Sequence, residues 1–124
     1  MLRIIDTNYA LRYLVQDDIK KAKEAQGIIN MGAYILPESL VEIVHVLIKG
    51  YEVDRKEVYF AIIDLLDDVE IFDKTLYEEA ARLFGKTKLD FVDCILISRN
   101  KLYNDKIYTF DKQLNKEIEQ NFID

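Results

Sequence analysis

The chain has 124 residues and carries 23 acidic against 17 basic side chains, which gives a formal net charge of −6. This length suits one domain with a single core, and the negative charge argues against binding of nucleic acid through a broad basic surface. It does not exclude a metal-dependent nuclease, because bound divalent cations reverse the local field of an acidic site.

The sequence shows no targeting segment and contains one cysteine. No apolar stretch approaches the length of a membrane span, and the amino-terminal residues lack a signal-peptide pattern. The single cysteine, Cys94, cannot form an internal disulfide, which fits a reducing compartment. We therefore expect one domain over residues 1–124, in a cytoplasmic protein without membrane contact.

The first predicted element is a short buried strand that leads into a helix over residues 8–15. Leu2, Ile4 and Ile5 form an apolar run that stops at Asp6. In open α/β sheets, ligands bind at the edge where such a strand ends. Asp6 would equally serve as the N-cap of the helix, and this stretch leaves both roles open.

The other elements follow from apolar periodicity, caps and turn residues. Asp17 or Asp18 can cap the second helix, Pro37 suits a first helical turn, and Asp54 with Glu57 forms a variant capping box. Further strands are expected over residues 32–36, 69–72 and 106–110, and helices over residues 18–30, 38–49, from 54 onward, 75–84, 90–102 and 112–120. Strands alternating with helices predict a three-layer α/β domain with a parallel sheet covered on both faces.

The third helix carries a narrow polar stripe on an otherwise apolar surface. Its members stand at positions i, i+4, i+7 and i+11: Glu38, Glu42, His45 and Lys49. The simpler interpretation is a well-packed helix whose remaining face meets water. The alternative is a stripe that lines a crevice, with Glu42 pointing into it.

Two acids stand on the first turn of the helix over residues 90–102. Capping accounts for Asp90, since helix N-termini favour carboxylates. Asp93 lies among Val92, Cys94 and Ile95, where an unpaired charge is costly, so it needs a partner.

A last acid, Asp111, follows the predicted strand over residues 106–110 as Asp6 follows the first strand. If these strands are parallel neighbours, Asp6 and Asp111 lie at the same sheet edge. Converging carboxylates repel one another unless a cation sits among them, and oxygen-rich sites of this kind suit Mg²⁺ or Mn²⁺.

Four blocks of the sequence resemble, in order, the signature blocks of PIN-domain ribonucleases, and in particular the toxins of bacterial and archaeal type II toxin–antitoxin pairs. They are IIDTN at residues 4–8, PESLVEI at 37–43, LDFVDCIL at 89–96 and YTFD at 108–111. The resemblance spans essentially the whole chain. It implies a parallel, about five-stranded sheet flanked by helices, of which four strands are evident here.

The resemblance also implies the site. Asp6, Glu42, Asp93 and Asp111 match the family's four acids, which hold one or two Mg²⁺ or Mn²⁺ ions and hydrolyse RNA phosphodiester bonds. The family pattern and the helix pattern together give four supporting residues: Thr7, Asn8, Asp90 and Thr109. The implied partners are an RNA substrate, an antitoxin protein and a second copy of the chain.

Several basic side chains lie near the third acid block and can meet RNA phosphates, although solvation is the simpler role for any one of them: Arg82, Lys86, Lys88 and Arg99. The only histidine, His45, is expected on a helix surface or partly buried. Cys94 is expected to act as a small core hydrophobe.

Two alternatives come from other functional classes. A PIN-like fold can serve as a binding module without catalysis, and retention of all four acids speaks against this. A response-regulator receiver domain has similar length and acidity. It would show an acid pair after the first strand and an aspartate after a central strand, whereas Asp6 has no acidic neighbour and no acid ends a strand near residue 55.

Overall fold

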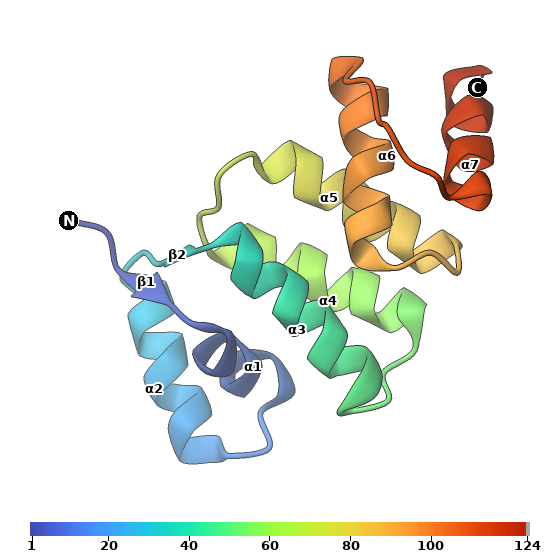
Figure 1. Ribbon diagram of the computed structural model, residues 1–124. Coiled ribbons are helices and arrows are strands. Elements are labelled where there is room, and N and C mark those ends of the chain that lie inside the picture. Colours follow the sequence, from blue (N-terminus) through green and yellow to red (C-terminus); the bar gives the residue numbers. More distant parts are fainter. Residues whose placement is uncertain (124) are drawn as a thin grey trace.

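The computed structural model describes residues 1–123, and helices dominate it (Figure 1). The strands are β1 (Ile4–Ile5) and β2 (Tyr34–Ile35), and the helices are α1 (Thr7–Val15), α2 (Ile19–Asn30), α3 (Pro37–Lys49), α4 (Arg55–Asp68), α5 (Lys74–Lys86), α6 (Phe91–Tyr103) and α7 (Lys112–Ile123). None of the described helices is both long enough and apolar enough to cross a membrane.

The sheet is small and parallel. β1 pairs with β2, with Ile5 opposite the fully buried Ile35. The predicted strand over residues 69–72 is reduced to a single bridge, in which Glu70 pairs with Tyr34 and its carbonyl accepts a 2.9 Å hydrogen bond from the Ile35 amide. The first two predicted strands are therefore confirmed in shortened form, and the third contributes one residue. The predicted burial of the first strand holds only for Ile5, because Leu2 and Ile4 are exposed.

The segment over residues 106–110 does not form the predicted strand. It has no ladder partner among the described residues, and Tyr108 is 90% exposed. The chain from α6 to α7 runs along the side of the molecule opposite to β1 (Figure 1), and α7 packs on α6, with Leu114 buried. Because this segment is unpaired and residues 69–72 contribute a single bridge, neither the five-stranded sheet nor the three-layer arrangement is found in the described residues.

Helix α3 runs through the centre of the core. Leu40, Ile43, Val44 and Leu47 are buried at helical spacing. Pro37 occupies the first helical position, as predicted, because its missing N–H has no intrahelical partner there. The exposed stripe of this helix is thereby fixed in direction, with Glu42 and His45 facing outward.

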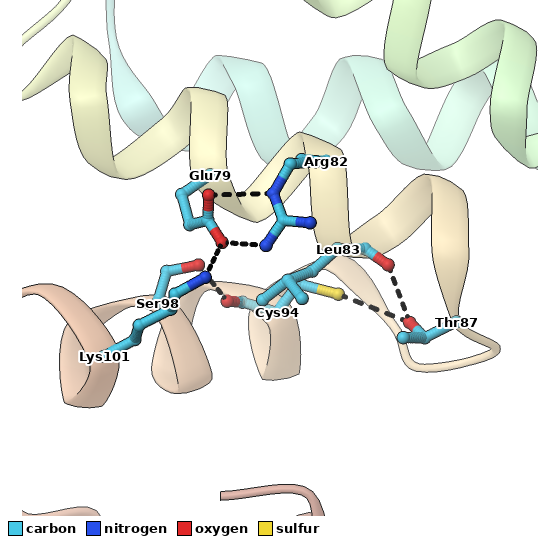
Figure 2. A network of polar contacts seen from close by, with 7 residues as sticks. All are labelled: Glu79, Arg82, Leu83, Thr87, Cys94, Ser98 and Lys101. Atoms are coloured by element: carbon cyan, nitrogen blue, oxygen red, sulfur yellow. Dashed lines mark hydrogen bonds and ion pairs between the residues drawn. The ribbon is translucent and has the colours of Figure 1, made fainter. Parts of the chain in front are cut away.

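Helices α5 and α6 are joined by polar contacts as well as apolar ones (Figure 2). The Glu79 carboxylate accepts hydrogen bonds from Arg82 in the same helix and, at 2.9 Å, from Lys101 of α6. Desolvation acts most strongly to raise the pKa of Glu79, but the bonds and charges of these two cations outweigh it, so the pKa is lowered. Glu79 is therefore bonded both within α5, to Arg82, and across to α6, to Lys101.

Most of the predicted helix N-caps are found in the structure. Asp18 accepts a 3.1 Å hydrogen bond from the Lys21 amide at the start of α2, which confirms one of the two predicted caps. Asp54 stands at the N-cap position of α4, but its side chain makes no capping hydrogen bond, so the predicted capping box is wrong. The exposed start of α4 leaves water to satisfy those amides.

Candidate active site

A threonine links the two elements that carry the first two predicted acids. Asp6 follows β1 and caps α1, accepting a 2.8 Å hydrogen bond from the Tyr9 amide through Oδ1. The hydroxyl of the next residue, Thr7, donates a 2.8 Å hydrogen bond to Oε1 of Glu42 in α3. Asp6 and Glu42 therefore stand on elements that a direct hydrogen bond ties together, and we call them the first acid group.

The other two acids form a second acid group with Asp90. Asp90 caps α6, its Oδ1 accepting a 2.8 Å hydrogen bond from the Asp93 amide, which confirms the predicted cap. The pKa of Asp93 is raised, chiefly by desolvation and further by the negative charges of Asp90 and Asp111. Asp111 thus lies near enough to Asp93 to repel it electrostatically.

Asp111 also has a local structural role. Its Oδ1 accepts hydrogen bonds of 2.9 and 3.0 Å from the amides of Gln113 and Leu114 at the start of α7. The Thr109 hydroxyl accepts a 3.0 Å hydrogen bond from the Asp111 amide, in keeping with the supporting position expected of Thr109. Asn8 is exposed on the first turn of α1.

The two acid groups are not merged into one cluster. Because residues 106–110 do not pair with β1, the expectation that Asp6 and Asp111 share a sheet edge is not met. Within residues 1–123, no three or more His, Cys, Asp or Glu side chains gather closely enough to hold a metal ion. The structure therefore presents two groups of carboxylates in place of four acids around one point.

The chemistry of these side chains fits a hard divalent cation. Mg²⁺ is usually bound by one or two carboxylates, with waters and substrate phosphates completing its shell. Each acid group can supply that number of carboxylates. The raised pKa of Asp93 reflects burial and like charges, and a cation beside it would relieve that repulsion.

Two of the four basic residues that could meet phosphates are engaged with acids. Arg82 binds Glu79 (Figure 2), and Arg99 donates to Asp105 at 2.6 Å. Lys86 and Lys88 are exposed, and the described residues include no ion-pair partner for either. The lysines therefore remain available to an anionic ligand.

A cleft of about 410 Å³ opens beside the second acid group, between α3, the start of α4 and the connection from α5 to α6. Its most constrained cation, Arg55, was not singled out from the sequence. Arg55 Nε donates to the Phe84 carbonyl at 3.0 Å, another guanidinium nitrogen donates to the Leu89 carbonyl, and the guanidinium lies 3.7 Å from the centre of the Phe84 ring. The available signal was a positive side chain on the first turn of a helix, where the helix dipole disfavours it.

The two remaining sequence predictions concern His45 and Cys94. His45 is exposed on α3 and lines the cleft, as expected for a helix-surface residue. Cys94 is completely buried, as expected of a core hydrophobe. Desolvation raises the pKa of its thiol to about 11, so Cys94 stays protonated at neutral pH and is a poor nucleophile.

Comparison with known proteins gives a family match over residues 3–117, to the PIN domain. The chain belongs to the PIN domain family. It is also similar to the "VapC ribonuclease" of Aquifex aeolicus (strain VF5), with 23% identity in an alignment 124 positions long that covers 93% of this chain and 91% of that protein. No solved structure gives a significant match.

Family membership narrows the alternatives raised by the sequence. The four predicted acids all lie inside the matched range of residues 3–117. The receiver-like alternative is set aside, because the match covers nearly the whole chain. A PIN domain is an α/β fold, and the chain shares that class while being mostly helical.

Proposed function

We propose that this PIN-domain protein is a metal-dependent endoribonuclease that acts as the toxin of a toxin–antitoxin pair. The observation that carries the proposal is the family match over residues 3–117, which includes Asp6, Glu42, Asp93 and Asp111. The similarity to a VapC ribonuclease over nine-tenths of both chains supports the reaction class. A catalytically silent PIN-like module is the alternative.

The residues that would hold one or two cations are the four acids, in their two groups. PIN nucleases of the VapC type generally use a divalent metal, and we propose Mg²⁺ or Mn²⁺ on the grounds of the oxygen ligands. The chemistry that such an ion supplies is activation of water and neutralisation of charge on the phosphoryl oxygens.

The chain's own residues orient these acids. Thr7 fixes one oxygen of Glu42 by its 2.8 Å hydrogen bond, and Asp90 takes the capping role on α6, which leaves the Asp93 side chain uncommitted to its own helix. Water is the attacking group, so a phosphorus–oxygen bond to water forms as the bond to the leaving ribose oxygen breaks. No side chain needs to become a covalent nucleophile.

The proposed partners follow from the same resemblance. They are an RNA substrate, an antitoxin protein that covers the acidic site, and a second copy of the chain in a homodimer. The proposed location is the cytoplasm, where such a toxin meets its RNA.

The deciding experiment is a cleavage assay on RNA with Mg²⁺ or Mn²⁺, with and without EDTA. We expect cleavage that EDTA abolishes and that Asp6→Asn removes without loss of the circular dichroism spectrum. Full activity in excess chelator would overturn the metal mechanism. Absence of cleavage with either ion would favour the silent module.

Metal binding can also be followed without activity. A cation that binds the native state raises the melting temperature by mass action. We expect millimolar Mn²⁺ to raise the melting temperature of the wild-type protein, and to raise that of Asp93→Asn less. An unchanged wild-type melting temperature would count against a metal site.

A further inference from the structure

The cleft beside the second acid group has a composition unlike the rest of the chain. Three cations and the single histidine line it, against one carboxylate, Asp90; they are His45, Lys49, Arg55 and Lys88. The chain as a whole has a net charge of −6. We propose that this cleft binds the phosphate backbone of single-stranded RNA, an inference that rests on the proposed nuclease function and names the substrate path to its acids.

Arg55 is a half-buried cation whose charge lacks an ion pair. Its hydrogen bonds go to two backbone carbonyls, those of Phe84 and Leu89, and the described residues include no carboxylate bonded to it. A guanidinium has five N–H donors, so donors remain for a ligand. The Asp90 carboxylate in the same cleft acts on this charge only through space, and a phosphate in the cleft would bond to the guanidinium directly.

Lys49 and Lys88 line the cleft from two different elements. Lys49 is on the last turn of α3, and Lys88 is in the connection between α5 and α6. That connection is fixed at two points, because Thr87 donates to the Leu83 carbonyl at 2.9 Å (Figure 2) and Arg55 donates to the Leu89 carbonyl. Both lysines are exposed, and neither forms an ion pair within the described part of the chain.

The cleft shares a structural element with each acid group, namely α3 with Glu42 and the start of α6 with Asp90 and Asp93. The polar stripe of α3 carries Glu42, then His45 and Lys49, and the seven residues from Glu42 to Lys49 correspond to a rise of about 10 Å. On the other wall, Asp90 lines the cleft and caps the helix turn that bears Asp93. A strand held in the cleft by its phosphates therefore lies beside Asp90 of the second acid group.

The walls of the cleft favour an unpaired strand over a duplex. Apolar side chains stand beside the cations, among them Val41, Ile48 and Val92, and the volume of about 410 Å³ is within the usual range for small-ligand sites. Bases of single-stranded RNA can turn out and contact such surfaces, whereas the bases of a helix are stacked inside it. The cations and the apolar walls together match a single strand.

The test measures binding without cleavage. A short fluorescein-labelled single-stranded RNA is titrated with protein in EDTA, and fluorescence anisotropy gives the affinity at several salt concentrations. The test variant is Lys49→Gln/Lys88→Gln, and the control is Lys20→Gln/Lys23→Gln on the exposed face of α2, which removes the same two charges. Melting temperatures of both variants exclude unfolding, and Lys49→Arg/Lys88→Arg restores the charge.

The test variant should bind RNA roughly tenfold more weakly, with the slope of log affinity against log salt reduced by about 1.4, since each phosphate contact on a single strand contributes about 0.7. The control and the arginine variant should stay within about twofold of wild type. A duplex of the same length should bind more weakly than the single strand.

Equal losses in the test and control variants would overturn the inference, because binding would then be diffuse. Tighter binding of a duplex, or displacement of the RNA by a short polyglutamate peptide at equal concentration, would overturn it as well, the latter in favour of an acidic protein segment. Lysine-dependent binding without cleavage in Mg²⁺ would refute the proposed function alone. Cleavage that is unaffected by Lys49→Gln/Lys88→Gln would refute this inference alone.

Discussion

The two acid groups differ in how their charges are compensated. In the first group, Glu42 receives a hydrogen bond from Thr7, and Asp6 receives one from the Tyr9 amide. In the second group, Asp93 is partly desolvated and faces the charges of Asp90 and Asp111, and its pKa is raised. Neutral donors bond to carboxylates in both groups, but the second also contains Asp93, whose repulsion by two neighbouring acids a cation would remove.

The largest expected effect tests whether both groups serve catalysis. Asp6→Asn and Asp93→Asn each remove one carboxylate from one group, and asparagine keeps the capping oxygen of Asp6. We expect each variant to lower kcat by more than about 100-fold, beyond the 10–100-fold typical of residues that only support a metal ligand. Single-turnover cleavage of RNA measures this. If one variant keeps wild-type activity, only the other group is catalytic.

The next effect concerns the hydrogen bond that organises the first group. Thr7→Val removes the hydroxyl that donates to Glu42 at 2.8 Å while keeping the side-chain shape. We expect activity to fall about tenfold, because Glu42 loses its fixed orientation. Thr7→Ser retains the donor and should recover most of the activity. A fully active valine variant would show that Glu42 needs no such support.

Substitutions of Asp90 test whether this acid of the second group acts as a helix cap and not in catalysis. Asp90→Ala removes the α6 cap and should lower the free energy of unfolding by about 1 kcal/mol, with substantial activity remaining. Asp90→Ser also caps and should restore most of that stability in urea unfolding. An inactive Asp90→Ser together with an active Asp93→Asn would mean that the roles of the two acids are reversed.

A smaller effect is the pH dependence that Asp93 imposes on stability. Its pKa is raised in the folded state, so the native protein binds the proton more tightly, and stability falls as pH rises from the unfolded value through the folded one. Asp93→Asn removes this loss. The melting temperature of the variant relative to wild type should therefore be higher at pH 7 than at pH 3.5. The same difference at both values would contradict the prediction.

Glu79 should show the opposite sign. Its pKa is lowered, despite desolvation, by Arg82 and Lys101, so its contribution to stability is present above the unfolded pKa and is lost as pH falls through the folded one. Glu79→Gln should cost up to about 1 kcal/mol at pH 7, as expected for a partly exposed ion pair, and less at pH 3. Thermal unfolding at the two pH values tests this, and a cost of equal size at both pH values would point to lost packing.

Interactions close in the chain were predictable from residue types. Asp18 and Asp90 cap their helices, and Pro37 begins α3. Each depends on residues within one turn, which the sequence displays directly. Asp54 shows the limit of this reasoning, since a suitable residue at the cap position made no capping bond.

The sequence by itself determined the helices, most caps, the apolar stripe of α3 and the identity of the candidate acids. Only the tertiary structure decided that residues 106–110 stay unpaired, that Arg82 and Arg99 are engaged by acids, and that Arg55 enters the cleft. An apolar run such as 106–110 has the composition of a strand, but a strand needs a neighbour, and the packing of α7 on α6 keeps β1 out of reach. Strand pairing and the lining of the cleft both depend on residues that are distant in the chain. Local sequence patterns carry no information about which distant groups meet.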